Sequence, residues 1–234
     1  MSSKKIIKIY NFLIMEYGYQ GWWPLISVYK KTGNYYHPHD YAFPKKKKQI
    51  YEICIGCILA QNTSWNNAFL GILALDSNKL LNSKKIMNIN LEKLAEIIKP
   101  AGYYNQKSEY ILNFTKFYRS TKIKNINRDK LLDIKGIGPE TADSMLLYAF
   151  NKPFFIVDAY TRRILFNLGI INDLELSYES ISNIFNRTYF NLNNKEKISF
   201  FQEFHALLVC HAKKYYQKKE TQKDDPLLKI LLWV

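Results

Sequence analysis

The stretch Leu131–Arg163, LLDIKGIGPETADSMLLYAFNKPFFIVDAYTRR, decides the fold of this 234-residue chain. Two helical patterns in it are joined by the tight turn KGIG at residues 135–138. Gly136 and Gly138 can adopt positive φ and leave the backbone uncovered, so another molecule can approach it closely. Pro139 has a preset φ and no N–H, which suits the first turn of a following helix, expected at about 139–150.

The start of that second helix is a candidate anion site. Its free N–H groups and the positive end of its dipole favour an anion, and a nucleic-acid phosphate is the obvious one. A Gly-x-Gly turn on its own is equally typical of a tight connection between two helices. Asp158 follows in an apolar run, just before Arg162 and Arg163. An aspartate there can cap a helix, and a capping carboxylate in a cleft can also face a substrate.

The composition is that of a basic globular protein. A formal net charge of +14 and a pI near 9.5 favour a polyanionic partner, although a lysine-rich composition with a well-solvated surface gives the same charge. The hydrophobic content of 47% excludes a disordered chain, and the length fits one large domain or two lobes. The lysine run 45–48 fits either a solvated patch or a contact to the DNA backbone.

The sequence carries no membrane or export signal. No apolar run is long enough to span a bilayer, and the N-terminus lacks the apolar segment and cleavage site of a signal peptide. Three cysteines do not make a disulfide framework. We therefore expect a cytoplasmic, nucleoid-associated protein without membrane contacts.

Apolar residues at helical spacing dominate the rest of the chain, and strand alternation is absent. The chain is therefore predicted to be all-α, with residues 25–50 forming a loop or short insertion. Besides the helices of the stretch quoted above, the expected helices cover residues 6–17, 49–59, 66–75, 91–98, 106–117, 162–167, 178–186 and 199–218.

The hairpin and Asp158 together resemble the helix-hairpin-helix and Gly/Pro-Asp signature of the endonuclease III-like DNA glycosylases, the HhH-GPD superfamily. The matching residues are Leu132, Ile134, Gly136, Ile137, Gly138, Thr141, Ala142, Val157 and Asp158. Three more stretches resemble the branch that includes the endonuclease III-type 3-methyladenine DNA glycosylases: GWWP at 21–24, ILAQNTSW at 58–65 and KPAGYYNQK at 99–107.

The resemblance implies a two-lobed architecture with a DNA cleft between the lobes. By the family's layout, residues 50–152 would form a helical barrel-like lobe that contains the hairpin at about 131–150. Residues 1–49 and 153–234 would form the second lobe from the two ends of the chain.

The resemblance also implies base-excision repair of double-stranded DNA containing a damaged base, by a monomer. Bifunctional members carry a hairpin lysine that forms a Schiff base and nicks the strand. The matching position here is Glu140, and its separation from Asp158 (158 − 140 = 18) agrees with the family spacing. A carboxylate cannot form an imine. We therefore expect a monofunctional glycosylase in which Asp158 activates water or stabilises the oxocarbenium-like sugar, with an alkylated purine such as 3-methyladenine as the favoured substrate.

Further roles follow from the matched positions. The hairpin residues implied to hold a DNA phosphate are Lys135, Gly136, Ile137, Gly138 and Thr141. The backbone carbonyls of Leu132, Ile134 and Ile137 match those that bind a monovalent cation, K⁺ or Na⁺, in family hairpins.

The base pocket is expected to include Trp22, Trp23 and Trp65, because aromatic faces stack on a flipped base. Core packing is the alternative role for these rings. Gln61 matches the side chain that enters the gap left by the flipped base, and its alternative is a helix-end hydrogen bond. Lys213 matches a pocket lysine of the branch, sometimes modified, and its alternative is a solvated position on a C-terminal helix.

No cofactor is expected to be required. Many family members hold a C-terminal [4Fe–4S] cluster on four cysteines, but this chain has no cysteine after Cys210, so no iron-sulfur cluster is expected. The residues expected to pack in its place are Leu227, Leu228, Ile230, Leu231, Leu232 and Trp233. The Cys54-x-x-Cys57 pair is interpreted as core rather than as a zinc site.

Two other functions stay open from the sequence. One is a glycosylase for oxidised or mismatched bases, with or without AP lyase activity through another lysine. The other is a non-catalytic helix-hairpin-helix DNA-binding protein. Asp158 argues against the second, because a pure binder needs no acid in a phosphate-lined cleft.

Overall fold

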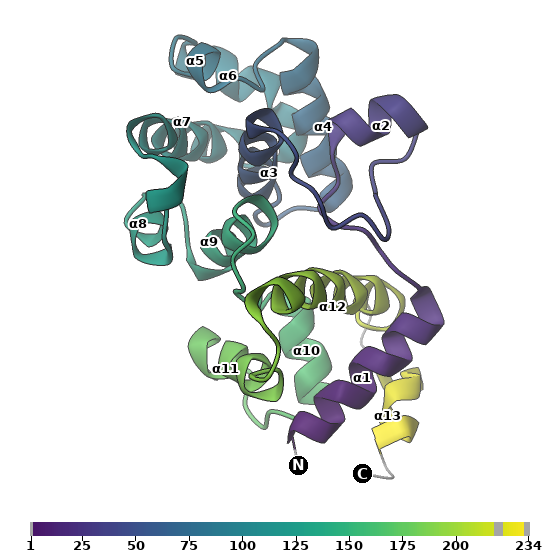
Figure 1. The fold of residues 1–234 in the computed structure, drawn as a ribbon. Helices are drawn as coiled ribbons and strands as arrows, with labels where there is room; N and C mark the ends of the chain where they lie inside the picture. Colours follow the sequence, from purple (N-terminus) through teal and green to yellow (C-terminus); the bar gives the residue numbers. More distant parts are fainter. Residues whose placement is uncertain (1, 218–221, 232–234) are drawn as a thin grey trace. The chain divides into compact units, whose positions relative to one another are not determined.

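The computed structural model describes residues 2–217 and 222–231, and within them the regular structure is helical, with no strand (Figure 1). This confirms the all-α prediction. No helix of the described part has the length and apolar character needed to cross a membrane. The elements are α1 (Ser2–Tyr17), α2 (Ile26–Thr32), α3 (Lys47–Leu59), α4 (Trp65–Ser77), α5 (Ser83–Ile86), α6 (Leu91–Ile97), η1 (Lys99–Ala101), α7 (Tyr104–Ser120), η2 (Ile123–Asn125), α8 (Arg128–Leu132), α9 (Pro139–Ser144), the π-helical η3 (Met145–Ala149), α10 (Ala159–Asn167), α11 (Tyr178–Thr188), α12 (Asn194–Tyr215), η4 (Gln222–Asp224) and α13 (Pro226–Leu231).

The chain divides into two compact units. The central unit comprises Trp23–Tyr36 and Ala42–Asn151, and the terminal unit comprises Met1–Trp22, His37–Tyr41 and Lys152–Val234. We expected residues 1–49 in the lobe formed by the chain ends, but residues 23–36 and 42–49 belong to the central unit. Long-range contacts explain the difference: the ring of Tyr35 packs 4.7 Å from that of Phe69, a residue of α4.

Helix α3 is the core of the central unit. It packs against α4, α7, α9 and η3, and its residues from Tyr51 to Leu59 are all buried. Over this stretch, apolar and small residues occupy every face of the helix, which is the pattern of a helix segment without a solvent face. Cys54 and Cys57 are among the buried residues, as expected for core positions.

Helix α2 contradicts the expectation that residues 25–50 form a loop or insertion. Its N-cap residue, Leu25, has no side-chain cap, and Gly33 ends the helix with φ 74°. The free N–H of Ile26 donates instead to the buried carboxylate of Glu52, at 2.6 Å. A cap supplied from α3 leaves no local signal in the sequence, so the helix was missed.

Glu52 makes the stability of the central unit depend on pH. Burial raises its pKa to about 7, even though the Ile26 N–H and nearby lysines act to lower it. The folded protein thus binds this proton more tightly than the unfolded chain, and stability falls as the pH rises from about 4.5 towards 7. We expect wild type to lose up to about 3 kcal/mol more than Glu52→Gln between pH 5 and pH 8, measured by denaturant unfolding. Equal losses in the two proteins would contradict this assignment.

The terminal unit is built around α12, which packs against α1 and α10. An aromatic cluster fills its interior: Phe155 stacks on Phe185 with ring centroids 3.5 Å apart, and Phe201 meets Phe155 edge-on at 5.2 Å. The burial of such rings contributes a large share of a core's hydrophobic stabilisation. This core holds α10 and the residue that caps it, Asp158, in place.

A buried polar network fastens the C-terminal segment to the terminal unit. Asp225 lies 3.0 Å from Nε2 of His211, accepts the Tyr216 hydroxyl at 2.6 Å and accepts the Leu227 N–H at 2.8 Å. Tyr17 of α1 lies 2.9 Å from the other ring nitrogen of His211. Because every member is paired, the network can be buried at little cost.

The apolar packing expected in this segment is seen in part. Leu227 and Leu231 of α13 are buried, and α13 contacts α1. Leu228 and Ile230 are half-buried. Leu232, Trp233 and the expected helix end at Lys218 lie outside the described residues.

Candidate active site and nucleic-acid interface

The hairpin lies in the central unit and consists of α8, the turn 133–138 and α9. Asn127 caps α8 by accepting the N–H of Lys130 at 3.1 Å. The guanidinium of Arg128 donates to the buried carboxylate of Asp143 at 2.8 Å and 3.3 Å, which ties the two helices together. Pro139 occupies the first turn of α9, as predicted.

The two glycines of the turn differ in their backbone conformation. Gly136 has φ 97°, which favours glycine, and a Cβ built there would lie 2.2 Å from the ring of Tyr110. Gly138 has φ −91°, so it does not use the positive φ that glycine allows at either position. A Cβ at Gly138 would meet no atom within 4 Å, because this residue faces open space.

The side chain of Gln61 makes hydrogen bonds to the hairpin. Its side-chain amide donates to the carbonyl of Gly136 at 2.9 Å and to the hydroxyl of Thr141 at 3.0 Å. Gln61 comes two residues after the end of α3, so these bonds join that helix end to the turn. In this structure the side chain therefore makes long-range bonds to the hairpin rather than a local helix-end bond.

Lys107 also holds the end of helix α3. It is 2% exposed, and its ammonium donates to the carbonyls of Leu59 at 2.8 Å and Ala101 at 2.7 Å. These are the last residues of α3 and η1, where carbonyls lack helical partners and favour a cation. Burial lowers the pKa of Lys107 to about 8. The segment that carries Gln61 is thus held by a buried cation.

A cavity of about 340 Å³ opens beside the turn. Glu140, the residue expected to match the lyase lysine, is one of the residues that line it. Glu140 is exposed and lies in the first turn of α9. Lys135 is also exposed and lies 3.6 Å from Glu109. The residues that line the cavity are Gln61, Asn62, Tyr103, Gln106, Lys107, Tyr110, Gly136, Gly138, Pro139, Glu140 and Thr141.

The carbonyls expected to bind a monovalent cation lie in the same turn. The Ile134 carbonyl accepts the N–H of Ile137 at 3.0 Å, which closes the turn and leaves one lone pair on that oxygen. Ile134 and Ile137 are buried and anchor the turn in the core, and Leu132 ends α8.

Asp158 lies in the terminal unit as the N-cap of α10. Its Oδ1 accepts the N–H of Thr161 at 2.7 Å, so the capping prediction is confirmed. Its Oδ2 lies 3.7 Å from Nε2 of His205, too far for a hydrogen bond but close enough for an ion pair when the imidazole carries a proton. The side chain of Asp158 is 14% exposed, so solvent reaches part of it.

The surroundings of Asp158 keep its carboxylate charged. Burial acts to raise its pKa, but His205 and the Thr161 N–H outweigh this, and the pKa is lowered from its usual value of 3.8. A charged group can act as a base or stabilise a developing cation.

The tryptophans expected in the base pocket fall into two groups. Trp22, in the terminal unit, meets the ring of His205 edge-on at 5.6 Å. Trp23 and Trp65, in the central unit, meet edge-on at 5.3 Å, and Trp23 also packs 5.1 Å from Tyr148. Trp23 is buried, which supports a core role, whereas Trp22 and Trp65 are half-buried residues.

Lys213 is exposed in the last turn of α12. Its neighbour Lys214 lies 3.5 Å from Glu16. This position matches the solvated alternative for Lys213.

Sequence reasoning gave no role to three residues that organise the site. Lys107 and Tyr110 hold the helix end and the turn, and His205 faces Asp158. The available signal for Lys107 was its helical spacing from the apolar residues Ile111 and Phe114, which puts it on their face of the helix. For Tyr110 and His205 the contact partner is distant in sequence, so no local signal exists.

Comparisons with known proteins give a matching family and a similar relative. The family described as HhH-GPD superfamily base excision DNA repair protein matches residues 55–188. A Methanocaldococcus jannaschii protein, whose name assigns it provisionally to the DNA repair glycosylases, is 37% identical over 97% of this chain and 96% of its own length.

Two solved structures extend the comparison. The Helicobacter pylori 3-methyladenine DNA glycosylase bound to 1,N6-ethenoadenine is 28% identical, with a TM-score of 0.65 over 72% of this chain and 86% of that chain. A non-covalent endonuclease III–DNA complex superposes with a TM-score of 0.73 over 98% of this chain and 94% of that chain. At 15% identity this second likeness concerns the fold alone.

Proposed function

Because this chain belongs to the HhH-GPD superfamily of base excision DNA repair proteins, we propose that it is a monofunctional DNA glycosylase. It hydrolyses the bond between a damaged base and its deoxyribose in double-stranded DNA, and it acts as a monomer. Its favoured substrate is an alkylated purine such as 3-methyladenine.

The observation that carries the proposal is the environment of Asp158. A charged carboxylate is fixed at the start of α10 by the Thr161 N–H, faces His205 and belongs to a side chain that is partly exposed. This arrangement suits a residue that must stay anionic next to a cationic sugar. It is more than a helix cap requires, since an exposed serine or asparagine would cap as well.

The chemistry is a hydrolysis at C1′ of the flipped nucleotide. The C1′–N bond breaks with its electron pair going to the base, while a water oxygen bonds to C1′ and gives a proton to Asp158. A 3-methyladenine leaves as a neutral base because it starts as a cation, so little acid catalysis is needed. The products are the free base and an abasic site.

The absence of lyase chemistry rests on Glu140. A lysine at this position would attack C1′ and form an imine, which a carboxylate cannot do. Glu140 lies in the first turn of α9, where a negative charge is favourable to the helix dipole.

The preference for alkylated purines rests on two observations. One is the similarity to the Helicobacter pylori enzyme over most of that protein's length. The other is that Trp22 and Trp65 are only half-buried, because a cationic base gains from an aromatic face that it can reach. In this proposal Gln61 leaves its hairpin bonds to fill the gap in the duplex.

The hairpin would hold a DNA phosphate through its backbone N–H groups, with Lys135 and Thr141 as further donors. Gly138 presents uncovered backbone in open space, which a phosphate can approach. We also propose that a K⁺ or Na⁺ ion can bind at the carbonyls of Leu132, Ile134 and Ile137. No iron-sulfur cluster and no other cofactor takes part in the proposed reaction.

The test is base release from duplexes that carry 3-methyladenine, 7-methylguanine, 8-oxoguanine, thymine glycol or uracil. We expect free 3-methyladenine, strand nicking only after alkali, and no borohydride-trapped protein–DNA adduct. Release of an oxidised base instead would overturn the substrate assignment. A trapped adduct would overturn the monofunctional assignment, and tight duplex binding without release of any base would favour a non-catalytic DNA-binding protein.

A further inference from the structure

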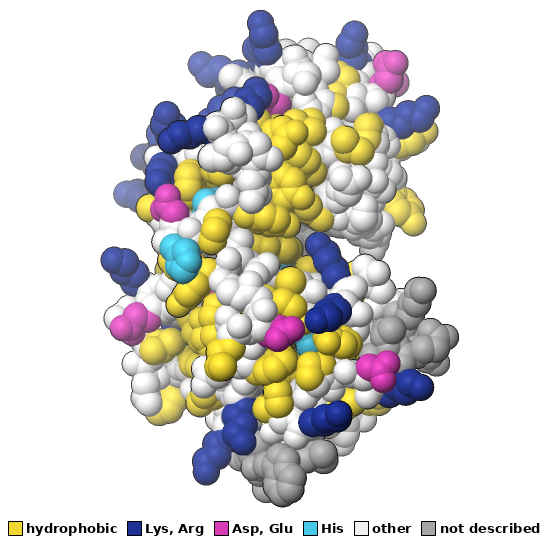
Figure 2. Space-filling model, turned by 90° about the vertical axis from the view of Figure 1, so that its right-hand side faces the viewer, with side chains coloured by type: hydrophobic (Ala, Val, Ile, Leu, Met, Phe, Trp, Pro, Cys, Tyr) yellow, Lys and Arg dark blue, Asp and Glu magenta, His cyan; other side chains and the backbone are white. Residues whose placement is uncertain are grey.

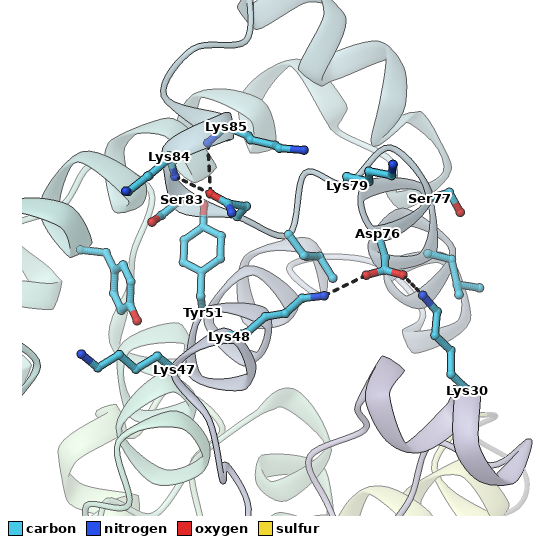
Figure 3. Close-up of a pocket in the computed structure, with 14 residues that line it drawn as sticks. Lys30, Lys47, Lys48, Tyr51, Asp76, Ser77, Lys79, Ser83, Lys84 and Lys85 are labelled. Atoms are coloured by element: carbon cyan, nitrogen blue, oxygen red, sulfur yellow. Dashed lines mark hydrogen bonds and ion pairs between the residues drawn. The ribbon is translucent and has the colours of Figure 1, made fainter.

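A second basic feature of the central unit lies away from the hairpin. A cavity of about 870 Å³ opens at the N-terminal end of α3 (Figure 3), and we name it the lysine pocket. Its lysines are Lys30, Lys47, Lys48, Lys79, Lys84 and Lys85, and its one carboxylate is Asp76. The formal charge of this lining is therefore +5 (6 − 1).

Asp76 organises part of this charge. It pairs with Lys30 and lies 3.4 Å from the ammonium of Lys48, and its side chain is only 9% exposed. Partial burial acts to raise its pKa, but the two lysines outweigh this and lower it, so the carboxylate stays charged. Lys47, Lys79, Lys84 and Lys85 remain as additional charges at the rim, and all four residues are exposed.

Local backbone structure places these four lysines. Lys47 begins α3, and Lys79 follows α4 with φ 57°. The side-chain carbonyl of Asn82 accepts the N–H groups of Lys84 and Lys85 at 2.9 Å and 3.3 Å, which starts α5 with both lysines at the pocket. Figure 3 shows the ammonium groups spread around the pocket rather than converging on one point.

The lysine pocket is separate from the hairpin cavity. Helix α3 has 13 residues, which gives it a length of about 20 Å. Lys47 and Lys48 lie at its first turn, whereas Leu59 and the following Gln61 contact Lys107 and the hairpin at its other end. An anion bound in the lysine pocket is therefore a different group from one bound at the hairpin.

We propose that the lysine pocket is a second nucleic-acid contact that binds the phosphodiester backbone of a strand. Lysine ammonium groups are compact point charges that suit phosphates, and contacts to phosphates carry no direct information about base sequence. Because the charges are spread around the cavity, several successive phosphates fit them better than one small anion does. Such a contact is independent of base sequence and of base excision.

The wider surface carries the same sign of charge. On the face drawn in Figure 2, Lys and Arg side chains are spread widely, while Asp and Glu side chains occur singly.

The experiment must therefore separate the effect of the lysine pocket from the effect of the protein's general positive charge. The triple variant Lys47→Gln, Lys84→Gln, Lys85→Gln removes pocket charges and leaves Asp76 with both of its partners. The matched triple Lys4→Gln, Lys93→Gln, Lys195→Gln removes the same charge from exposed positions outside the pocket.

Binding of both variants and wild type to an undamaged duplex is measured over a range of salt concentrations. The pocket triple is expected to lower affinity by about tenfold or more at low salt and to reduce the slope of log K against log salt by about 2 to 3. The matched triple is expected to keep most of the wild-type slope. Equal effects of the two triples would overturn the proposal.

Lysine acetylation with mass-spectrometric readout locates the contact directly. In wild type, duplex DNA is expected to protect Lys47, Lys84 and Lys85 but not Lys93. Protection by inorganic tripolyphosphate and not by duplex would assign the pocket to a soluble polyphosphate and overturn the nucleic-acid assignment. Neither measurement requires base release, so failure of the proposed glycosylase activity leaves this test intact.

Discussion

Replacement of Asp158 by Asn is expected to lower the single-turnover rate of base excision by about 10³-fold, within the range for a lost catalytic acid or base. The amide keeps an oxygen that can accept the Thr161 N–H, and asparagine caps helices as well as aspartate does. The variant should therefore remain folded and bind duplex DNA like wild type. The change removes only the negative charge that the proposed mechanism places next to the sugar.

The control is Asp173→Asn in the same unit. Asp173 also accepts a backbone N–H through its carboxylate, from Glu175 at 2.8 Å, but it is exposed. Its replacement should leave the excision rate unchanged. Because the pKa of Asp158 is lowered below 3.8, its protonation should not reduce the wild-type rate between pH 5 and pH 8. Unchanged excision in Asp158→Asn would rule out the proposed catalytic role.

Replacement of Gly136 by Ala is expected to destabilise the protein by about 3 kcal/mol, because it combines a positive φ with overpacking. The new methyl group would lie 2.2 Å from the Tyr110 ring, which cannot move away freely because it belongs to the long helix α7. The turn must shift, and the carbonyl that accepts the Gln61 amide shifts with it. Denaturant unfolding measures the loss, and duplex affinity should fall as well.

Gly138→Ala is the matched control two residues away. Its φ of −91° is ordinary for alanine, and the new methyl group meets no atom. Stability should stay within about 1 kcal/mol of wild type, the typical cost of a substitution without a clash. Duplex affinity should still fall, because the methyl group covers backbone that a phosphate would approach. If Gly136→Ala proved as stable as Gly138→Ala, the clash with Tyr110 would not limit this turn.

The sequence predicts the hairpin well because its determinants are local. Gly136, Pro139 and the capping Asp158 act within a few residues of their own positions, and the structure has them as the turn, the helix start and the N-cap. The family could also be predicted from the sequence, because the same residues carry its signature.

The features that were missed depend on contacts between distant residues. Helix α2 starts on a carboxylate 26 residues away, so residues 25–50 read as a loop. Lys107 reaches a carbonyl 48 residues away, and His205 meets Asp158 only after α10 and α12 have packed. Propensity and periodicity cannot report such pairs, because each residue alone fits several environments.

The network of His211, Asp225, Tyr216 and Tyr17 has a consequence for how the protein matures. Its parts are all encoded in the polypeptide, so this fastening of the C-terminal segment is complete as soon as the chain has folded. It needs no metal delivery and no assembly machinery, whereas a metal-held segment takes part of its folding free energy from the ion. The attachment of this segment therefore follows from the folding of the polypeptide alone.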